Sequence, residues 1–381
     1  PSVEIDSNLF VSGLFDGPEN SIDLKLTTNG FRYSGVQIDT LNFLVNHKKN
    51  SIVSEMNIKS LSLDKDIFYR NIYVKAEGVS DTLSVIIKND NETKPEFKSD
   101  ISFGGVLLGP EKIHLAFDSS YVVLADSIWV LNSHNLIEMD SNRWAFDSFN
   151  LVSNHKKINL SGAISEDTSD VLKIILGELN LANFTKIVGI NEAQLDGNIS
   201  GDISLSKLYF RPEISSSIYV NDLSANGEYI GSGPINSSWN TDKKRFDVDF
   251  DLFRPADSAF IDTIRSIKFF GHYYPQIEDT SFHLKLISDG FKIKAIEPIV
   301  KEYITDISGE LIGELDLTGS FKNPVLKGEM RLDSTQFKIV YLNTNYFAHE
   351  QTIKFREEWF GFDKLKLQDD FGKLATADGT V

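Results

Sequence analysis

The sequence has 381 residues, a formal net charge of −17 and no cysteine. Nucleic-acid binding needs clustered lysine and arginine, and the sequence has no basic stripe, so we expect no nucleic-acid partner. The missing cysteines exclude disulfides, thiolate metal sites and cysteine nucleophiles.

The ends of the sequence suggest a piece of a longer protein. The chain begins at Pro1 without an initiator methionine, and the pattern of a new strand begins at Gly379-Thr380-Val381. No apolar run approaches the roughly 18 residues of a membrane span. We therefore expect any membrane anchor to lie outside this fragment.

Strand patterns follow one another along the whole chain. Residues 22–26, 113–117, 246–252 and 282–286 alternate apolar and polar side chains. This period belongs to strands with one apolar and one wet face, as in antiparallel sheets. Turn signals such as Asn226-Gly227 separate these runs. The sequence therefore predicts an all-β, antiparallel fold.

Two short stretches have helical features. Leu181, Phe184, Ile187 and Val188 have helical spacing. The segment 298–304 begins with Pro298, which suits the first helical position. Because each stretch precedes a glycine-rich strand, we expect short helices at a rim or end of the sheet.

A glycine–proline frame occurs twice, 112 residues apart. The first copy contains Gly197, Gly201 and Pro212, and the second contains Gly309, Gly313 and Pro324. Glycine on the apolar face of a strand marks a bend or a close backbone approach. Proline suits a turn or a strand start. The repetition predicts an elongated array of similar units in a bent, twisted sheet whose apolar concave face forms a groove.

The apolar side chains of both frames are candidates to line this groove. They alternate with acidic and small polar residues, so they share one face of their strands. The candidate groove residues are Ile199, Ile203, Leu205, Leu311, Leu315, Leu317 and Phe321. Periodicity alone does not separate an open groove from the closed core of a β-sandwich.

No catalytic or metal motif is present in the sequence. Asp247, Asp249 and Asp251 have a spacing found in calcium loops, but the intervening apolar residues and the missing glycine indicate the wet face of a strand. The seven histidines form no zinc-ligand pattern. We expect no enzyme activity, no cofactor and no metal.

The repeated frame and the C-terminal tail resemble the TamB and AsmA-like family. The tail motifs are Ile353-Lys354-Phe355, Leu365-Lys366-Leu367, Asp370-Phe371-Gly372 and Asp378-Gly379-Thr380. The resemblance implies a sheet folded into an open groove. It further implies β-groove repeats over residues 1–194, a repeat unit with the frame over 195–306, and the start of a TamB-like C-terminal domain over 307–381. Only the general strand pattern carries the resemblance in residues 1–194.

The resemblance also implies a function. Proteins of this family are anchored in the inner membrane and reach across the periplasm to the outer membrane of double-membrane bacteria. They are implicated in moving phospholipid through an apolar groove, with an outer-membrane barrel of the BamA superfamily, such as TamA, as partner. Two alternatives stay open: an assembly or secretion factor for outer-membrane β-barrel proteins, and a structural or adhesive β-rich surface protein.

Overall fold

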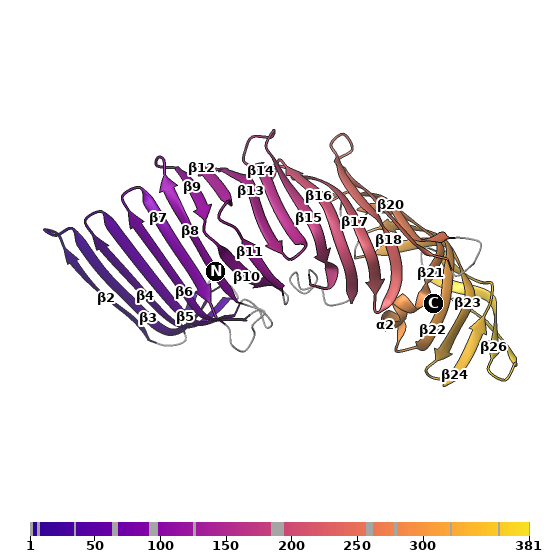
Figure 1. Ribbon diagram of the computed structural model, residues 1–381. Coiled ribbons are helices and arrows are strands. Elements are labelled where there is room, and N and C mark those ends of the chain that lie inside the picture. The colour runs from indigo at the N-terminus through magenta and orange to yellow at the C-terminus, as the bar shows by residue number, and fades with distance from the viewer. Residues whose placement is uncertain are drawn as a thin grey trace. The chain divides into compact units, whose positions relative to one another are not determined.

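The computed structural model is built almost entirely from β-strands (Figure 1). It describes residues 3–5, 8–33, 36–62, 68–90, 98–124, 127–183, 194–256, 262–277, 280–320, 322–356 and 359–380. Every strand pairing found among these residues is antiparallel, from β1 with β3 to β26 with β27. The predicted all-β, antiparallel fold class is therefore confirmed, while the open groove stays a prediction.

The chain divides into two compact units. The first comprises Pro1–Gly177 and Ser206–Pro212, and the second comprises Glu178–Leu205 and Glu213–Val381. The strands that belong mainly to the first unit are β1 (Val3–Ile5), β2 (Leu9–Asp16), β3 (Ser21–Tyr33), β4 (Val36–Lys48), β5 (Ser51–Ser62), β6 (Phe68–Val79), β7 (Thr82–Asn89), β8 (Ser99–Leu107), β9 (Lys112–Phe117), β10 (Ser120–Leu124), β11 (Ser127–Leu131), β12 (Leu136–Asp140), β13 (Arg143–Ser153), β14 (Lys156–Ile164) and β15 (Val171–Asn180).

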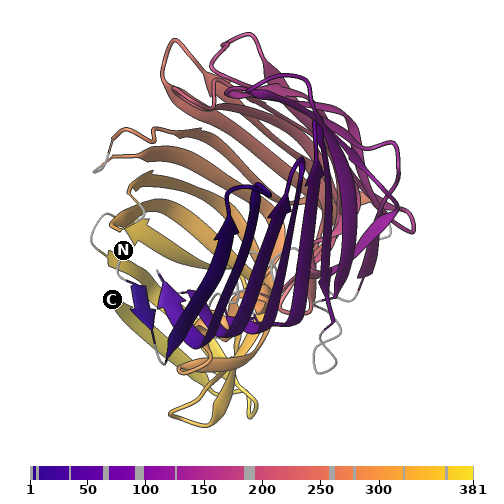
Figure 2. The same cartoon turned by 90° about the vertical axis from the view of Figure 1, so that its left-hand side faces the viewer.

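Consecutive hairpins build the first unit, and Figure 2 shows its indigo and purple strands as a row of neighbours. Each strand from β2 to β8 pairs with the next one along the chain. Beyond them, β9 and β10 lie end to end along β8, and β13 pairs with both β11 and β12. The rings of Phe103, Phe117 and Phe149 contact one another across this region, with successive centroids 5.3 Å apart.

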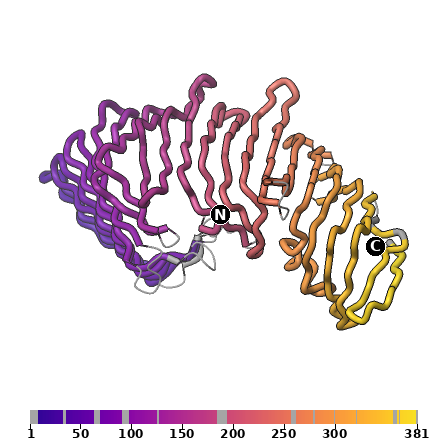
Figure 3. Tube along the Cα trace, turned by 45° about the vertical axis from the view of Figure 1, so that its right-hand side comes forward, coloured from indigo at the N-terminus to yellow at the C-terminus, as the bar shows by residue number. Residues whose placement is uncertain are grey.

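The second unit continues the same pattern, and the orange and yellow trace of Figure 3 runs back and forth through its later strands. Its strands are β16 (Leu195–Ser206), β17 (Glu213–Ala225), β18 (Glu228–Asn240), β19 (Arg245–Pro255), β20 (Thr263–Tyr273), β21 (Phe282–Lys292), β22 (Ile304–Gly319), β23 (Pro324–Ile339), β24 (Thr344–Ala348), β25 (Gln351–Arg356), β26 (Trp359–Asp369) and β27 (Leu374–Thr380). Each strand from β17 to β23 pairs with the next, and β24 and β25 lie end to end between β23 and β26.

Bulges bend many of these strands. Asp222 in β17 and Ser334 in β23 have positive φ values of 53° and 48°, and each stands where its ladder changes register. An extra residue on one side of an antiparallel pair kinks the strand and increases its twist. These bulges therefore give the strands of the second unit a curvature that a regular ladder lacks.

The helix predicted over 298–304 begins earlier than expected and is shorter. The 3-10 helix η2 spans Ile293–Ile296 and α2 spans Glu297–Val300, while Ile304 already pairs with Ile339 as the first residue of β22. Ile293 and Ala295 are buried, and this packing starts the helical segment ahead of the proline. Of the other predicted helix, residues 181–183 are helical, and Phe184, Ile187 and Val188 lie outside the described residues.

Candidate apolar binding site

One face of the second unit is apolar across six neighbouring strands. Residues directly opposite one another in an antiparallel pair share a face, so the register defines a continuous row. From β17 to β22 this row is Ile218, Ile235, Phe250, Phe269, Leu286 and Leu315. A parallel row from β19 to β23 is Val248, Gly271, Leu284, Leu317 and Leu326.

Large side chains in these rows keep part of their surface accessible. Phe250, Phe269 and Leu286 are half-buried, although they lie in the middle of the sheet order. By contrast, Val220 and Leu252, which are also apolar residues of β17 and β19, are completely buried. The rows thus present apolar surface that the described residues cover only in part.

The opposite face is wet and charged. Lys268 Nζ lies 3.1 Å from Asp251 Oδ2, and this hydrogen bond raises the pKa of the Lys268 ammonium. Lys285 Nζ lies 2.5 Å from a carboxylate oxygen of Glu314, with the same effect on the pKa of Lys285. Asp251 also accepts a hydrogen bond from Arg265 Nε at 2.9 Å. The Asp247–Asp251 series therefore lies along the paired strand β19 with its carboxylates on the wet face, as predicted.

The second glycine of each frame allows two backbones to approach closely. A Cβ on Gly201 would lie 2.1 Å from the carbonyl oxygen of Ser217, and one on Gly313 would lie 2.3 Å from that of Glu329. Their φ values of 145° and 148° are also strained for residues with a side chain. Glycine is required at both positions because a side chain would collide with the neighbouring strand.

The two frames form the same hairpin twice. Gly201 faces Ser217 in β17, and the positions 112 residues later, Gly313 and Glu329, face each other in the same way. The bulges at Asp222 and Ser334 are separated by the same 112 residues. Pro212 immediately precedes β17 and Pro324 is the first residue of β23. The repeat seen in the sequence is therefore a structural repeat of β16–β17 and β22–β23.

The candidate groove residues lie on these two hairpins. Ile199 and Leu315 are buried, with 8% and 9% of their surface exposed. The half-buried members are Ile203, Leu205, Leu311 and Leu317, and Phe321 lies outside the described residues. Leu311, Leu315 and Leu317 come together on β22, whereas the β16 candidates lie on a separate strand. Their role in lining a groove stays a prediction.

An apolar cavity that the sequence did not predict lies near the C-terminal end of the second unit. Its volume is about 220 Å³, and eleven of its twelve lining residues are apolar, with Thr335 the exception. Its walls come from η2 and from strands β22, β23, β25, β26 and β27, and they include Ile293, Ile307, Leu332, Ile353, Leu365 and Leu367. The alternation around Leu365-Lys366-Leu367 signals the apolar face, but no local pattern signals the space beside it.

A buried arginine lies in the same unit. Arg254 on β19 is only 4% exposed, and it forms an ion pair with Glu310 of β22. Its Nε donates to the Gly290 carbonyl oxygen at 3.0 Å, and its Nη1 donates to that of Pro255 at 3.0 Å. Lys292 Nζ lies 2.9 Å from the same Glu310 carboxylate. These contacts compensate for the cost of burying the charge and tie β19, β21 and β22 together.

The helical segment η2–α2 is fixed to the end of the hairpin β17–β18. Asn226 Nδ2 donates to the Ala295 carbonyl oxygen at 2.7 Å, and Lys294 Nζ lies 2.7 Å from Glu228. Ile296 and Val300 pack against the apolar cluster that surrounds the cavity. The segment therefore closes one side of the cavity while it is held by polar contacts on its other side.

The described residues contain no group of three or more histidine, aspartate or glutamate side chains arranged to hold a metal ion. None of the helices in the described ranges is long and apolar enough to cross a membrane. No protein-family model, curated protein or solved structure with which the chain was compared matches it.

Proposed function

We propose that this chain carries phospholipid, without enzymatic chemistry, along the apolar face of its antiparallel strands. The observation that carries the proposal is the continuous row Ile218, Ile235, Phe250, Phe269, Leu286 and Leu315, whose large members Phe250, Phe269 and Leu286 stay half-buried. The resemblance of the glycine–proline frame and the tail to the TamB and AsmA-like family supports the same function.

The energetics of an acyl chain favour such a surface. Removing a methylene from water is worth roughly 0.8 kcal/mol, so a chain of about sixteen carbons gains roughly 13 kcal/mol when it is fully covered. Neighbouring strands lie about 4.8 Å apart, so a row across six strands offers apolar contact over roughly 24 Å. A tail can move along such a row without leaving apolar surroundings at any step.

The cellular setting follows from the resemblance. On this proposal the full protein is anchored in the inner membrane, crosses the periplasm and meets a BamA-superfamily barrel in the outer membrane. This chain would then supply a stretch of the conduit.

Photo-crosslinking at two adjacent positions tests the proposal. A photoreactive amino acid replaces Leu317, on the apolar face, or Thr318, the next residue on the opposite face of β22. Each protein is irradiated with vesicles of clickable phosphatidylethanolamine. We expect lipid adducts at Leu317 at least tenfold more abundant than at Thr318, because only the first position faces an acyl chain.

The pair of positions provides its own control, because both lie on one strand and differ only in the face they occupy. Equal labelling at Leu317 and Thr318, or no lipid adduct at Leu317, would refute the proposed lipid path.

A second function is favoured by one edge of the first unit. Strand β2 pairs with β3, and no described strand pairs with its other side. Five of its apolar residues are exposed: Leu9, Phe10, Val11, Leu14 and Phe15. An open apolar edge can template an incoming strand, as an assembly factor for β-barrel proteins requires. A photoreactive residue at Phe10 that captures an unfolded barrel protein, with no lipid adduct at Leu317, would support this alternative.

A further inference from the structure

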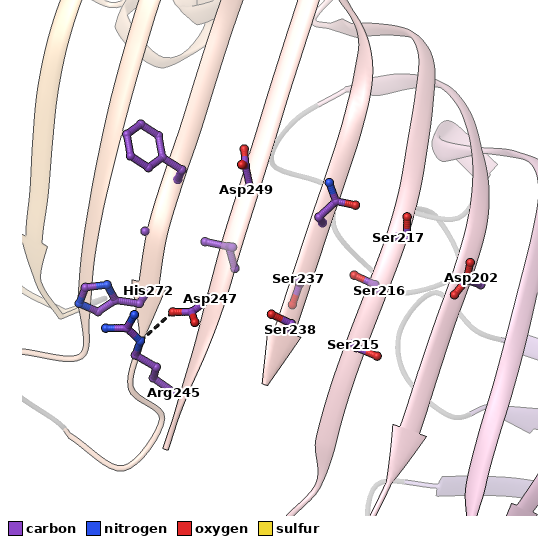
Figure 4. A pocket seen from close by; sticks show the side chains of 14 residues that line it. Asp202, Ser215, Ser216, Ser217, Ser237, Ser238, Arg245, Asp247, Asp249 and His272 are labelled. Atoms are coloured by element: carbon purple, nitrogen blue, oxygen red, sulfur yellow. Dashed lines mark ion pairs between the residues drawn. The ribbon is translucent and has the colours of Figure 1, made fainter. Parts of the chain in front are cut away.

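The wet face of the second unit contains a shallow hollow over strands β16 to β20, with a volume of about 580 Å³ (Figure 4). Two rows of side chains border it. One row is Ser215, Ser238, Asp247 and His272, and the other is Ser217, Asn236, Asp249 and Phe270. Each row runs across four neighbouring strands, so its members repeat at about 4.8 Å. Between the rows the floor is backbone, because the intervening side chains point to the other face.

Four polar groups of this hollow have no hydrogen-bond partner in the part of the chain that the structure describes. Ser215, Ser217, Asn236 and Ser238 are exposed, and their side chains form no hydrogen bond with any described residue. Some polar side chains elsewhere on the same face are paired, as Lys285 is with Glu314 at 2.5 Å. The hollow therefore gathers three hydroxyl groups and one amide group that are available to a ligand.

The charge of the hollow restricts the ligand. Three carboxylates, those of Asp202, Asp247 and Asp249, border it. Only two cations among the described residues pair with them: Arg245 Nε lies 2.7 Å from Asp247 Oδ1, and Lys268 Nζ lies 3.5 Å from Asp249 Oδ1. Carboxylates only accept hydrogen bonds, so they suit a ligand that carries many O–H donors. The excess of negative charge disfavours phosphates, nucleic acids and acidic peptides. The site is thus suited to an uncharged, hydroxyl-rich molecule.

Phe270 supplies an apolar surface at one end of the hollow. A pyranose ring presents hydroxyl groups at its edge and C–H groups on its face, so it can pack on an aromatic ring while its edge forms hydrogen bonds. The repeated polar groups run over three strand spacings, or roughly 14 Å. This length matches a short linear oligosaccharide better than a single sugar.

We propose that this hollow is a binding site for a neutral oligosaccharide. The sugar chain lies across the strands, with its hydroxyls bonded to Ser215, Ser238 and Asn236 and one ring against Phe270. The site is separate from the apolar rows, because it occupies the other face of the same strands. The same strands can therefore bind a glycan on their wet face and an acyl chain on their apolar face.

Saturation-transfer NMR with three neutral tetrasaccharides, built from glucose, mannose and N-acetylglucosamine, tests the proposal. We expect transfer from the protein to at least one of them. The double variant Asn236→Leu, Ser238→Leu fills the hollow and removes two polar groups, so the signal should fall at least tenfold. Leucine is compatible with a strand, and circular dichroism checks that the fold persists.

The matched control is Thr318→Leu, which adds similar bulk on the wet face of β22, away from the hollow. It should keep the full transfer signal. Transfer to none of the three tetrasaccharides, or equal transfer in the double variant and the parent, would overturn the proposal. Because the lipid crosslinks at Leu317 are measured on the other face, failure here leaves the lipid proposal unaffected.

Discussion

Single residues of the glycine–proline frame define how closely the strands of the second unit can approach. Gly313 has a φ of 148°. A Cβ at this position would lie 2.3 Å from the carbonyl oxygen of Glu329. Neither feature can be relieved by a side-chain rotation, because the obstacle is backbone. The frame glycines are therefore a requirement of the hairpin and not a consequence of composition.

We expect Gly313→Ala to lower the free energy of unfolding by about 2–4 kcal/mol, because it adds both a clash and backbone strain. Urea unfolding measures the change. Gly109→Ala is the control, since a Cβ there meets no atom within 4 Å, and it should change stability by less than about 0.5 kcal/mol. Equal effects of the two substitutions would contradict the close-approach account.

We expect the free energy of unfolding to depend on pH through His272. Burial lowers its pKa from the ordinary value of 6.5, and Arg245 and His283 add to this shift, while Asp247 opposes it. The folded protein therefore binds fewer protons than the unfolded chain as the pH falls below about 6.5, and it loses stability over that range. The same effect is absent above this range, where the histidine is neutral in both states.

The variant His272→Gln should lose part of this acid sensitivity. Melting temperatures measured at about pH 7.5 and about pH 5.5 should differ less in the variant than in the parent. His134→Gln, an exposed histidine in a turn, should leave the parent's difference unchanged. If His272→Gln shows the parent's full loss on acidification, burial of this imidazole is not the cause.

At the scale of elements, the η2–α2 segment and the last strands enclose the apolar cavity. Ala377 and Ala375 both pack against the surrounding cluster, two residues apart on β27, but only Ala377 lines the cavity. We expect Ala377→Leu to raise the free energy of unfolding by about 1–2 kcal/mol, because the added carbons fill space of about 220 Å³ at roughly 0.8 kcal/mol per methylene.

Ala375→Leu is the matched control. Ala375 does not line this cavity. We therefore expect the added carbons to cause a loss of about 1–3 kcal/mol from overpacking. Differential scanning calorimetry on both variants measures the changes. Destabilisation by Ala377→Leu equal to that by Ala375→Leu would show that the cavity does not accept the added side chain.

Local sequence patterns predict some features of these elements and not others. Strands and their apolar faces were predictable because alternation depends only on neighbouring residues, as in 246–252. The start of the helical segment was not, because the burial of Ile293 and Ala295 depends on distant packing. Arg254 looks like a surface residue in the sequence, since its partners Gly290 and Glu310 lie 36 and 56 residues away. The cavity likewise needs residues from β22, β23, β25, β26 and β27 together.

At the scale of the whole molecule, antiparallel hairpins recur through both units. Many of their strands have one apolar and one polar face. The frame hairpins recur at 112 residues with the same register and the same bulge, so the second unit is assembled from repeated pieces. We infer lipid transport from two features of this unit: the apolar rows on one face of its strands and the ion-paired side chains on the other.

Phospholipid retained by the purified chain is the most direct test of that inference. The chain is extracted in mild detergent and its bound lipids are counted by mass spectrometry, together with Phe269→Asn on the apolar face and Phe270→Asn on the wet face. Both side chains are half-buried neighbours on β20. We predict phospholipid on the parent and on Phe270→Asn, and its loss from Phe269→Asn. A parent without phospholipid, or equal amounts on the two variants, would contradict the account.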